Sequence, residues 1–146
     1  MNKAAVILLA DDDPNDVELT LTALAELNLA DKVQVVHDGA EALDYLYRRG
    51  KFATRPDANP LVVLLDLKMP KVDGLEVLQK IKTDEKLKTV PVVALSSSRE
   101  SPDVRQCYDQ GVNAFVVKPV GYPDFVNAVK QLGAFWADIN QPPLQS

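Results

Sequence analysis

The sequence predicts an α/β domain built on a doubly wound parallel sheet of five strands. Short apolar runs alternate with segments of helical periodicity along the 146 residues. The run at residues 61–65 is apolar at every position, which is typical of a strand buried on both faces. Such alternation places helices on both faces of one parallel sheet. We expect a single domain spanning 1–146, with a core over about residues 5–137, a short tail over 138–146 and no output domain.

A short apolar run predicts each strand. The runs cover residues 5–10, 33–36, 61–65, 91–95 and 114–117. The first run leads straight into three aspartates and lacks a small-residue cleavage site, so we interpret it as a strand and not as a signal peptide. Because no run is long enough to span a membrane, we expect a cytoplasmic protein without membrane contacts. The single cysteine, Cys107, excludes an internal disulfide and is expected in the core.

The first two predicted helices begin at recognisable caps. Asp13 caps the first helix, Pro14 fits its first position and Asp16 suits the positive end of the helix dipole. Asp38, followed three residues later by Glu41, resembles a capping box for the second helix, which we expect to end at a glycine, residue 50. The other three helices follow the third, fourth and fifth strands.

Composition and charge exclude several classes of function. The formal net charge is −5, and the lysines between residues 80 and 88 are interleaved with acids, so no basic patch for nucleic acid is expected. His37 is the only histidine. Its isolation argues against a Ser-His-Asp triad and against a histidine-rich zinc site.

Polar side chains follow four of the five predicted strands. They are Asp11, Asp12 and Asp13 after the first strand, Asp66 after the third, Ser96 after the fourth and Lys118 after the fifth. The carboxyl ends of parallel strands lie at one edge of the sheet, where ligands of such folds bind. Acids, a hydroxyl and an amine should therefore converge there.

Clustered carboxylates need compensation. Two like charges ~4 Å apart repel by about 4 kcal/mol at an effective dielectric of 20, so a proton or a cation must offset them. Carboxylate oxygens favour Mg²⁺, and Lys118 adds a fixed positive charge. This site suits a phosphoryl group. Asp66 is the predicted nucleophile because it ends the central strand, and Ser96 is placed to donate to a phosphoryl oxygen.

Each of these features also has a simpler interpretation. In that interpretation, the three aspartates only form a capped, solvated turn, and for Asp13 alone this is the role that we expect. Similarly, residues 96–98 would be an ordinary polar loop, and Lys118 would form a plain salt bridge with Asp66. Placement of all of them at four strand ends favours a common site.

In this order along the chain, the residues resemble the receiver domain of two-component response regulators. The resemblance rests on the acidic pair, Asp66, Met69-Pro70 with Asp73-Gly74, Ser96 and Lys118-Pro119, and it covers about residues 5–132. It implies a flavodoxin-like, CheY-like (βα)5 sheet with strand order 2-1-3-4-5. It also implies a phosphoprotein of phosphorelay signal transduction that accepts a phosphoryl group from a sensor histidine kinase. Such a protein is a switch, not an enzyme, although it takes part in its own phosphorylation and dephosphorylation.

The resemblance implies the metal ligands and the acceptor. Asp66 takes the phosphoryl group and is also a ligand of Mg²⁺. Asp12 binds the metal directly, Asp11 binds it through water, and the backbone carbonyl of Lys68 completes the protein ligands. Lys118 binds a phosphoryl oxygen. The side chain of Lys68 stands where the family sets the rate of dephosphorylation.

The resemblance also implies a switch. Ser96, in place of the more usual threonine, moves toward the phosphoryl group, and Phe115 turns inward behind it. Ser97 is small enough to admit the phosphodonor. The bond between Lys118 and Pro119 is expected to be cis.

Three further segments are similar to regulators paired with bacterial phytochromes. They are the long loop at residues 50–60, the stretch 97–104 and the pair Phe135-Trp136. They imply a phytochrome kinase as partner and a homodimer through the fourth helix, the fifth strand, the fifth helix and the two aromatics. The alternative for Phe135 and Trp136 is that they cover the core under the last helix.

Two rival functions share some of these features. A phosphohydrolase of the haloacid dehalogenase type also uses an aspartyl phosphate, Mg²⁺, a hydroxyl and a lysine. However, it has a second aspartate two residues after the nucleophile, where this chain has Lys68, and no cap domain is present. A phosphorylation-independent interaction scaffold is disfavoured because the acidic pair, Asp66 and Lys118 are all intact.

Overall fold

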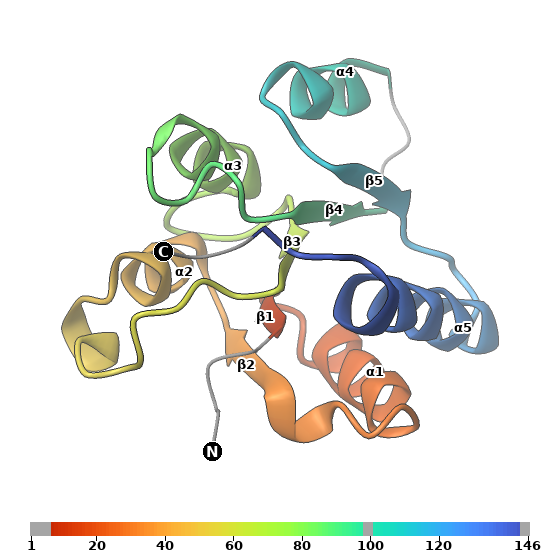
Figure 1. Cartoon of the computed structure of the whole chain (residues 1–146). Coiled ribbons are helices and arrows are strands. Elements are labelled where there is room, and N and C mark those ends of the chain that lie inside the picture. The colour runs from red at the N-terminus through yellow and green to blue at the C-terminus, as the bar shows by residue number, and fades with distance from the viewer. Residues whose placement is uncertain (1–6, 98–100, 144–146) are drawn as a thin grey trace.

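Five parallel strands form the sheet in the order β2-β1-β3-β4-β5, as expected (Figure 1). The computed structural model describes residues 7–97 and 101–143. Residues 5–6 of the expected first strand and 98–100 of the phytochrome-like stretch lie outside the described residues. The strands are β1 (Ile7–Ala10), β2 (Val33–Val36), β3 (Val62–Asp66), β4 (Val92–Ser96) and β5 (Ala114–Val117).

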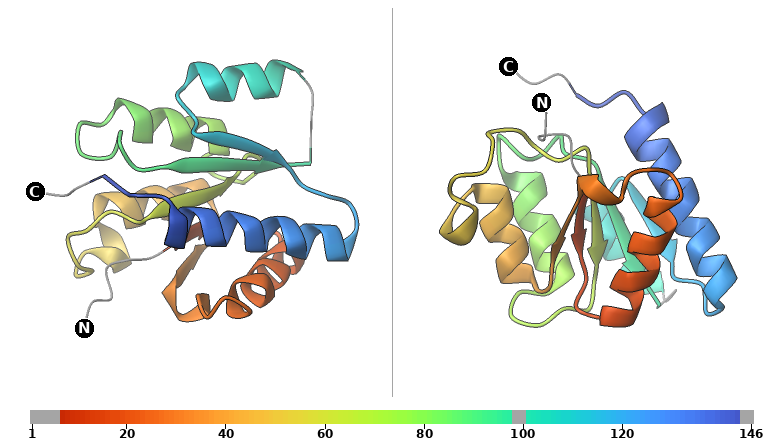
Figure 2. Two further views of the ribbon diagram at one scale, coloured as in Figure 1. Left: turned by 45° about the vertical axis from the view of Figure 1, so that its right-hand side comes forward. Right: turned by 90° about the horizontal axis from the view of Figure 1, so that it is seen from below.

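Helices cover both faces of the sheet. They are α1 (Pro14–Ala25), α2 (Gly39–Tyr47), α3 (Gly74–Thr83), α4 (Ser101–Asp109) and α5 (Tyr122–Gly133). Shorter turns are η1 (Ala30–Lys32) and η2 (Gly50–Phe52), and the π-helical η3 (Ala134–Ile139) continues α5. Helices α1 and α5 lie side by side on one face, and α2, α3 and α4 lie on the other (Figures 1 and 2).

The central strands are apolar on both sides because each side faces a helical layer. Leu9 and Leu64 pack toward α1 and α5, whereas Leu8 and Leu65 pack toward α2, α3 and α4. All four are at most 1% exposed. Each such side chain contributes roughly 1.5–3 kcal/mol of transfer free energy, which explains why the strands show no polar alternation. Cys107 is also fully buried, as expected.

The predicted caps are present. Asp13 accepts hydrogen bonds from the backbone N–H groups of Asn15 and Asp16. The Asp38 carboxylate accepts from the N–H of Glu41 at 2.7 Å, and the Glu41 carboxylate accepts from the N–H of His37 at 2.7 Å. This second bond reaches one residue earlier than in a standard capping box.

Helix α2 ends earlier than the sequence indicated. It stops at Tyr47 because Arg48, not Gly50, takes the left-handed conformation that closes the helix, with φ 58°. Arg55 then fixes the long loop. Its guanidinium donates to the carbonyls of Tyr45, Pro56 and Ala58 and lies 4.1 Å from the centre of the Tyr45 ring.

The prediction of a cis bond between Lys118 and Pro119 is wrong, because no described peptide bond is cis. The backbone N–H of Lys118 donates to the carbonyl of Ser96 at 2.7 Å, so the chain leaves β5 still aligned with β4. The trans form is the lower-energy default for such a bond. In the part of the chain that is described, no helix has the length and apolar character to cross a membrane.

Gly74 is predicted to be intolerant of a side chain because it begins α3 directly against the end of β3. A Cβ at this position would lie 2.5 Å from the carbonyl oxygen of Asp66 and 2.6 Å from Cα of Leu67. We expect Gly74→Ala to lower the free energy of unfolding by about 1–3 kcal/mol, since the backbone must shift. Urea denaturation measures this change.

Gly121→Ala is the control for this substitution. The nearest atom to a Cβ at Gly121 is 3.9 Å away, so we expect a change below about 0.5 kcal/mol. Equal destabilisation by both substitutions would contradict the close-contact explanation.

Candidate phosphoacceptor and metal site

The pairing of the strands brings the predicted polar residues to one edge. Ala10 is aligned with Leu65, so the next residues along the chain, Asp11 and Asp66, emerge side by side. Ser96 is aligned with Val117 at the end of β5, which places Lys118 one residue beyond. The expected convergence of acids, hydroxyl and amine is therefore present.

Three carboxylates form the centre of the site. Asp11, Asp12 and Asp66 each offer an oxygen within 4.8 Å of the others. Asp11 is 1% exposed and Asp66 is 7% exposed, whereas Asp12 is exposed. Backbone N–H groups of Asp13 and Lys68 donate to Asp11 and Asp66, at 3.0 and 3.3 Å. Such a set of hard oxygen atoms, open on one side, fits a divalent cation.

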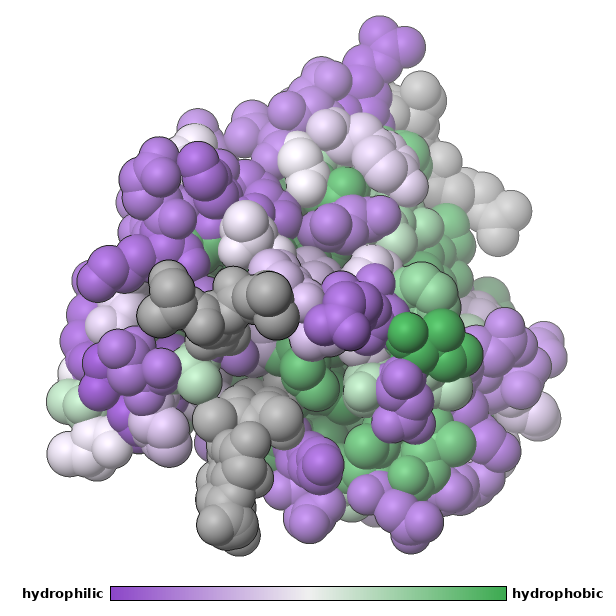
Figure 3. Space-filling model, viewed as in Figure 1, coloured by the Kyte–Doolittle hydropathy of each residue, from purple (hydrophilic) through white to green (hydrophobic). Residues whose placement is uncertain are grey.

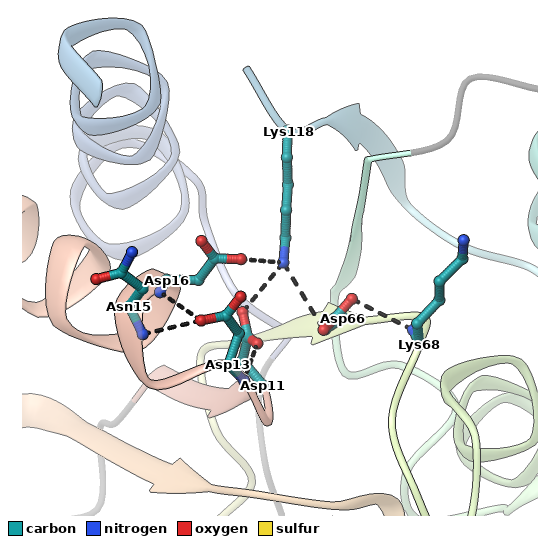
Figure 4. Close-up of polar contacts among 7 residues, drawn as sticks. All are labelled: Asp11, Asp13, Asn15, Asp16, Asp66, Lys68 and Lys118. Atoms are coloured by element: carbon teal, nitrogen blue, oxygen red, sulfur yellow. Dashed lines mark hydrogen bonds and ion pairs between the residues drawn. The ribbon is translucent and has the colours of Figure 1, made fainter. Parts of the chain in front are cut away.

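The Lys118 ammonium lies in this cluster, but Asp66 is not its closest partner. Its Nζ lies 2.8 Å from Oδ2 of Asp16, 3.2 Å from Oδ2 of Asp11 and 3.7 Å from Oδ2 of Asp66 (Figure 4). A plain Lys118–Asp66 salt bridge is therefore only the longest of three ion pairs. Sequence reasoning assigned Asp16 only to the helix end and missed this contact. Its position three residues after the cap, in a turn next to the acidic pair, was the available signal.

The electrostatics of the cluster leave negative charge uncompensated. Burial raises the pKa of Asp66 to about 7, with the Lys118 charge opposing the shift and the Asp11 charge adding to it. Burial also raises the pKa of Asp11. For Lys118, burial lowers the pKa, but the hydrogen bond to Asp16 and the charges of Asp11 and Asp66 outweigh it and raise the pKa. Lys118 is thus a fixed cation, and a second cation would let the carboxylates ionise together.

The remaining predicted residues surround the cluster. Ser96 ends β4 and is 2% exposed, whereas Ser97 is exposed. Phe115 is aligned with Ala94, is half-buried and packs against the core under α2, α3 and α4. The Lys68 side chain is exposed and extends away from the carboxylates, so only its backbone contacts Asp66 (Figure 4).

Residues 7–130 match the model of the response regulator receiver domain. The chain belongs to this family. It is 37% identical to the probable methanogenesis regulatory protein FilR2 of Methanothrix harundinacea, over 94% of this chain and 87% of that protein. It is 34% identical to the response regulator Rcp1 of Synechocystis sp., over 94% of this chain and 92% of that protein.

Solved receiver structures share the whole fold. The phosphorylated cyanobacterial phytochrome response regulator RcpA is 37% identical, with a TM-score of 0.90 and coverage of 96% of this chain and 99% of that one. The Mn²⁺-bound form of Rcp1 is 33% identical, with a TM-score of 0.89 and coverage of 96% and 99%. The bacteriophytochrome response regulator RtBRR is 55% identical, with a TM-score of 0.76 and coverage of 95% and 84%.

These relationships confirm the predicted family and the predicted CheY-like fold. The protein is a receiver domain homologous to phytochrome response regulators, a family whose members act as phosphoacceptor switches. The pocket of Asp11, Asp12 and Asp66 fits a phosphoacceptor beside a divalent metal, and receiver domains bind a divalent metal at this pocket. Membership of this family argues against the haloacid dehalogenase alternative.

Proposed function

We propose that this receiver domain accepts a phosphoryl group from the histidine of a sensor kinase onto Asp66, with Mg²⁺ in the carboxylate pocket, and changes its partner binding as a result. One observation carries the proposal. A buried aspartate ends the central strand beside two further acids and a lysine ammonium. This arrangement binds anionic oxygens and offers one sheltered carboxylate as nucleophile.

The proposed transfer uses groups at four strand ends. An oxygen of Asp66 attacks phosphorus, the P–N bond to the kinase histidine breaks, and the imidazole leaves with the electron pair. Lys118 and the Ser96 hydroxyl bind oxygens of the phosphoryl group. Mg²⁺ would be held by Asp12, Asp66 and the Lys68 carbonyl, with Asp11 acting through water, and would offset charge on the transferring group.

The proposed switch follows from the added charge. Phosphorylation adds roughly one to two negative charges at Asp66. A shift from a mostly inactive to a mostly active population needs ~5 kcal/mol of differential stabilisation, which one Ser96 contact cannot supply alone. Lys118 and the metal must contribute. Phe115 and the face formed by α4, β5 and α5 would carry the change, while Ser97 and Lys68 would set access and the lifetime of the phosphorylated state.

Substitution of the acceptor tests the proposal. With acetyl phosphate and Mg²⁺, we expect one phosphoryl group on the wild-type chain and none on Asp66→Asn, because an amide is not a nucleophile here. Asp73→Asn is the matched control, since Asp73 caps α3 by accepting from the N–H of Glu76 and asparagine caps equally well. Intact-mass spectrometry and peptide mapping give the result.

Two outcomes would contradict this assignment. Equal labelling of wild-type chain and Asp66→Asn would remove Asp66 as the acceptor. Continuous turnover of a general phosphomonoester would favour a phosphohydrolase instead.

We also propose that the kinase partner is a bacterial phytochrome. The support is the 55% identity to RtBRR, a bacteriophytochrome response regulator, and the likeness to RcpA, a phytochrome response regulator. We expect phosphotransfer from a purified bacteriophytochrome histidine kinase to be at least about tenfold faster than from an unrelated sensor kinase, because pairing is set by surface complementarity. Rapid-quench assays measure both rates, and comparable rates would refute this pairing.

We further propose a homodimer through α4, β5, α5 and η3. The exposed large apolar residues on these elements are Tyr108, Tyr122, Phe135 and Ile139, and Val120 is exposed in the loop between β5 and α5. Figure 3 shows hydrophobic surface gathered where α1 and α5 lie, in the lower right of the view. The two aromatics of η3 play different parts, because Trp136 packs against the core under α1 and α5 and Phe135 is 44% exposed.

Phe135 provides the test of this interface. We expect Phe135→Ala to raise the dimer dissociation constant at least about tenfold, since aromatic anchors carry much of the energy of an interface. Sedimentation equilibrium, with and without beryllofluoride, measures it. Tyr47→Ala on α2 is the control and should leave the constant unchanged. A wild-type chain that remains monomeric in both conditions would contradict the proposal.

A further inference from the structure

The closest partner of the Lys118 ammonium lies outside the carboxylate pocket. The 2.8 Å contact to Asp16 is shorter than the contacts to Asp11 and Asp66, at 3.2 and 3.7 Å. The side chains of Lys118 and Asp16 are 11% and 24% exposed, so water screens this ion pair less than a surface pair. Asp16 comes from α1, whereas Asp66 is the last residue of β3 and Asp11 follows β1.

The start of α1 places the Asp16 carboxylate. Asp13 caps the helix and accepts from the N–H of Asp16, and Pro14 sets its first turn. A carboxylate in the first turn is stabilised by the positive end of the helix dipole. Asp16 is not among the three acids that could hold a metal. Its contact with Lys118 is therefore separate from the three-acid group.

The hydrogen bonds of Lys118 leave its ammonium at a distance from the acceptor. An ammonium has three N–H donors, and two of them are used by Asp16 and Asp11. The 3.7 Å separation from Asp66 exceeds the range of a hydrogen bond. At this distance Lys118 makes no hydrogen bond to Oδ2 of Asp66 that would have to break before attack, and its ammonium lies between Asp16 and Asp66 (Figure 4).

We propose that Asp16 is a positioning residue for Lys118, holding the ammonium off the Asp66 nucleophile before transfer and beside the phosphoryl group during it. This inference rests on the proposed phosphoacceptor function. Without Asp16, Lys118 pairs directly with Asp66. That charge-assisted hydrogen bond must then break before Asp66 can attack, which slows phosphorylation.

The test compares three chains under saturating acetyl phosphate at fixed Mg²⁺. We expect Asp16→Ala to phosphorylate about tenfold more slowly than wild type, the factor that corresponds to one charge-assisted hydrogen bond. Glu18→Gln removes one negative charge from the same helix at an exposed position, so its rate should match wild type. The far-UV circular dichroism spectrum of Asp16→Ala should match that of wild type, which shows that the variant is folded.

A double substitution shows whether Asp16 acts through Lys118. In a Lys118→Ala background, Asp16→Ala should cause no further loss of rate. The proposal is overturned if Asp16→Ala phosphorylates as fast as wild type or faster, if Glu18→Gln shows the same loss, or if the loss persists without Lys118. A wild-type chain that takes no phosphoryl group would instead refute the proposed function.

Discussion

Two buried carboxylates placed side by side are the constraint on which the site depends. Asp11 and Asp66 are neighbours because β1 and β3 are paired, and the sheet cannot separate them without losing its register. Each has lost most of its hydration, and each repels the other. The surrounding hydrogen-bond donors partly offset this repulsion and loss of hydration. Lys118 supplies positive charge, and the N–H groups of Asp13 and Lys68 bind one oxygen of each acid.

These donors do not fully offset the negative charge of the two acids, and the pKa of Asp66 reflects this. The pKa of Asp66 is raised from 3.8 to about 7, so the folded chain holds this proton more tightly than the unfolded chain. In the metal-free protein, the contribution of Asp66 to stability is therefore present below about pH 4 and is lost as the pH rises toward 7. A divalent cation in the pocket would favour the ionised form of Asp66, so metal binding and the ionisation of this acid are linked.

Periodicity and strand ends predicted most of the fold and the centre of the site. The sheet pairs residues in parallel, so polar residues that end different strands must meet, and this needed no knowledge of side-chain positions. The contact between Asp16 and Lys118 could not be predicted in this way. It joins residues that are 102 positions apart and depends on how the first turn of α1 faces the edge of the sheet. The early end of α2 was missed because Arg48 accepts a left-handed conformation that sequence rules assign to glycine.

Lys118 contacts both the acids of the pocket and the end of a neighbouring strand. Its side chain contacts acids from α1, β1 and β3, while its backbone N–H donates to the carbonyl of Ser96 at the end of β4. Phe115 lies three residues before it on β5, and α5 follows after a short loop. A new anion at Asp66 would change the balance of forces on this one side chain, and the same residue anchors the end of β5. The route from the pocket to the surface of β5 and α5 is therefore short and continuous, which is what a charge-driven switch requires.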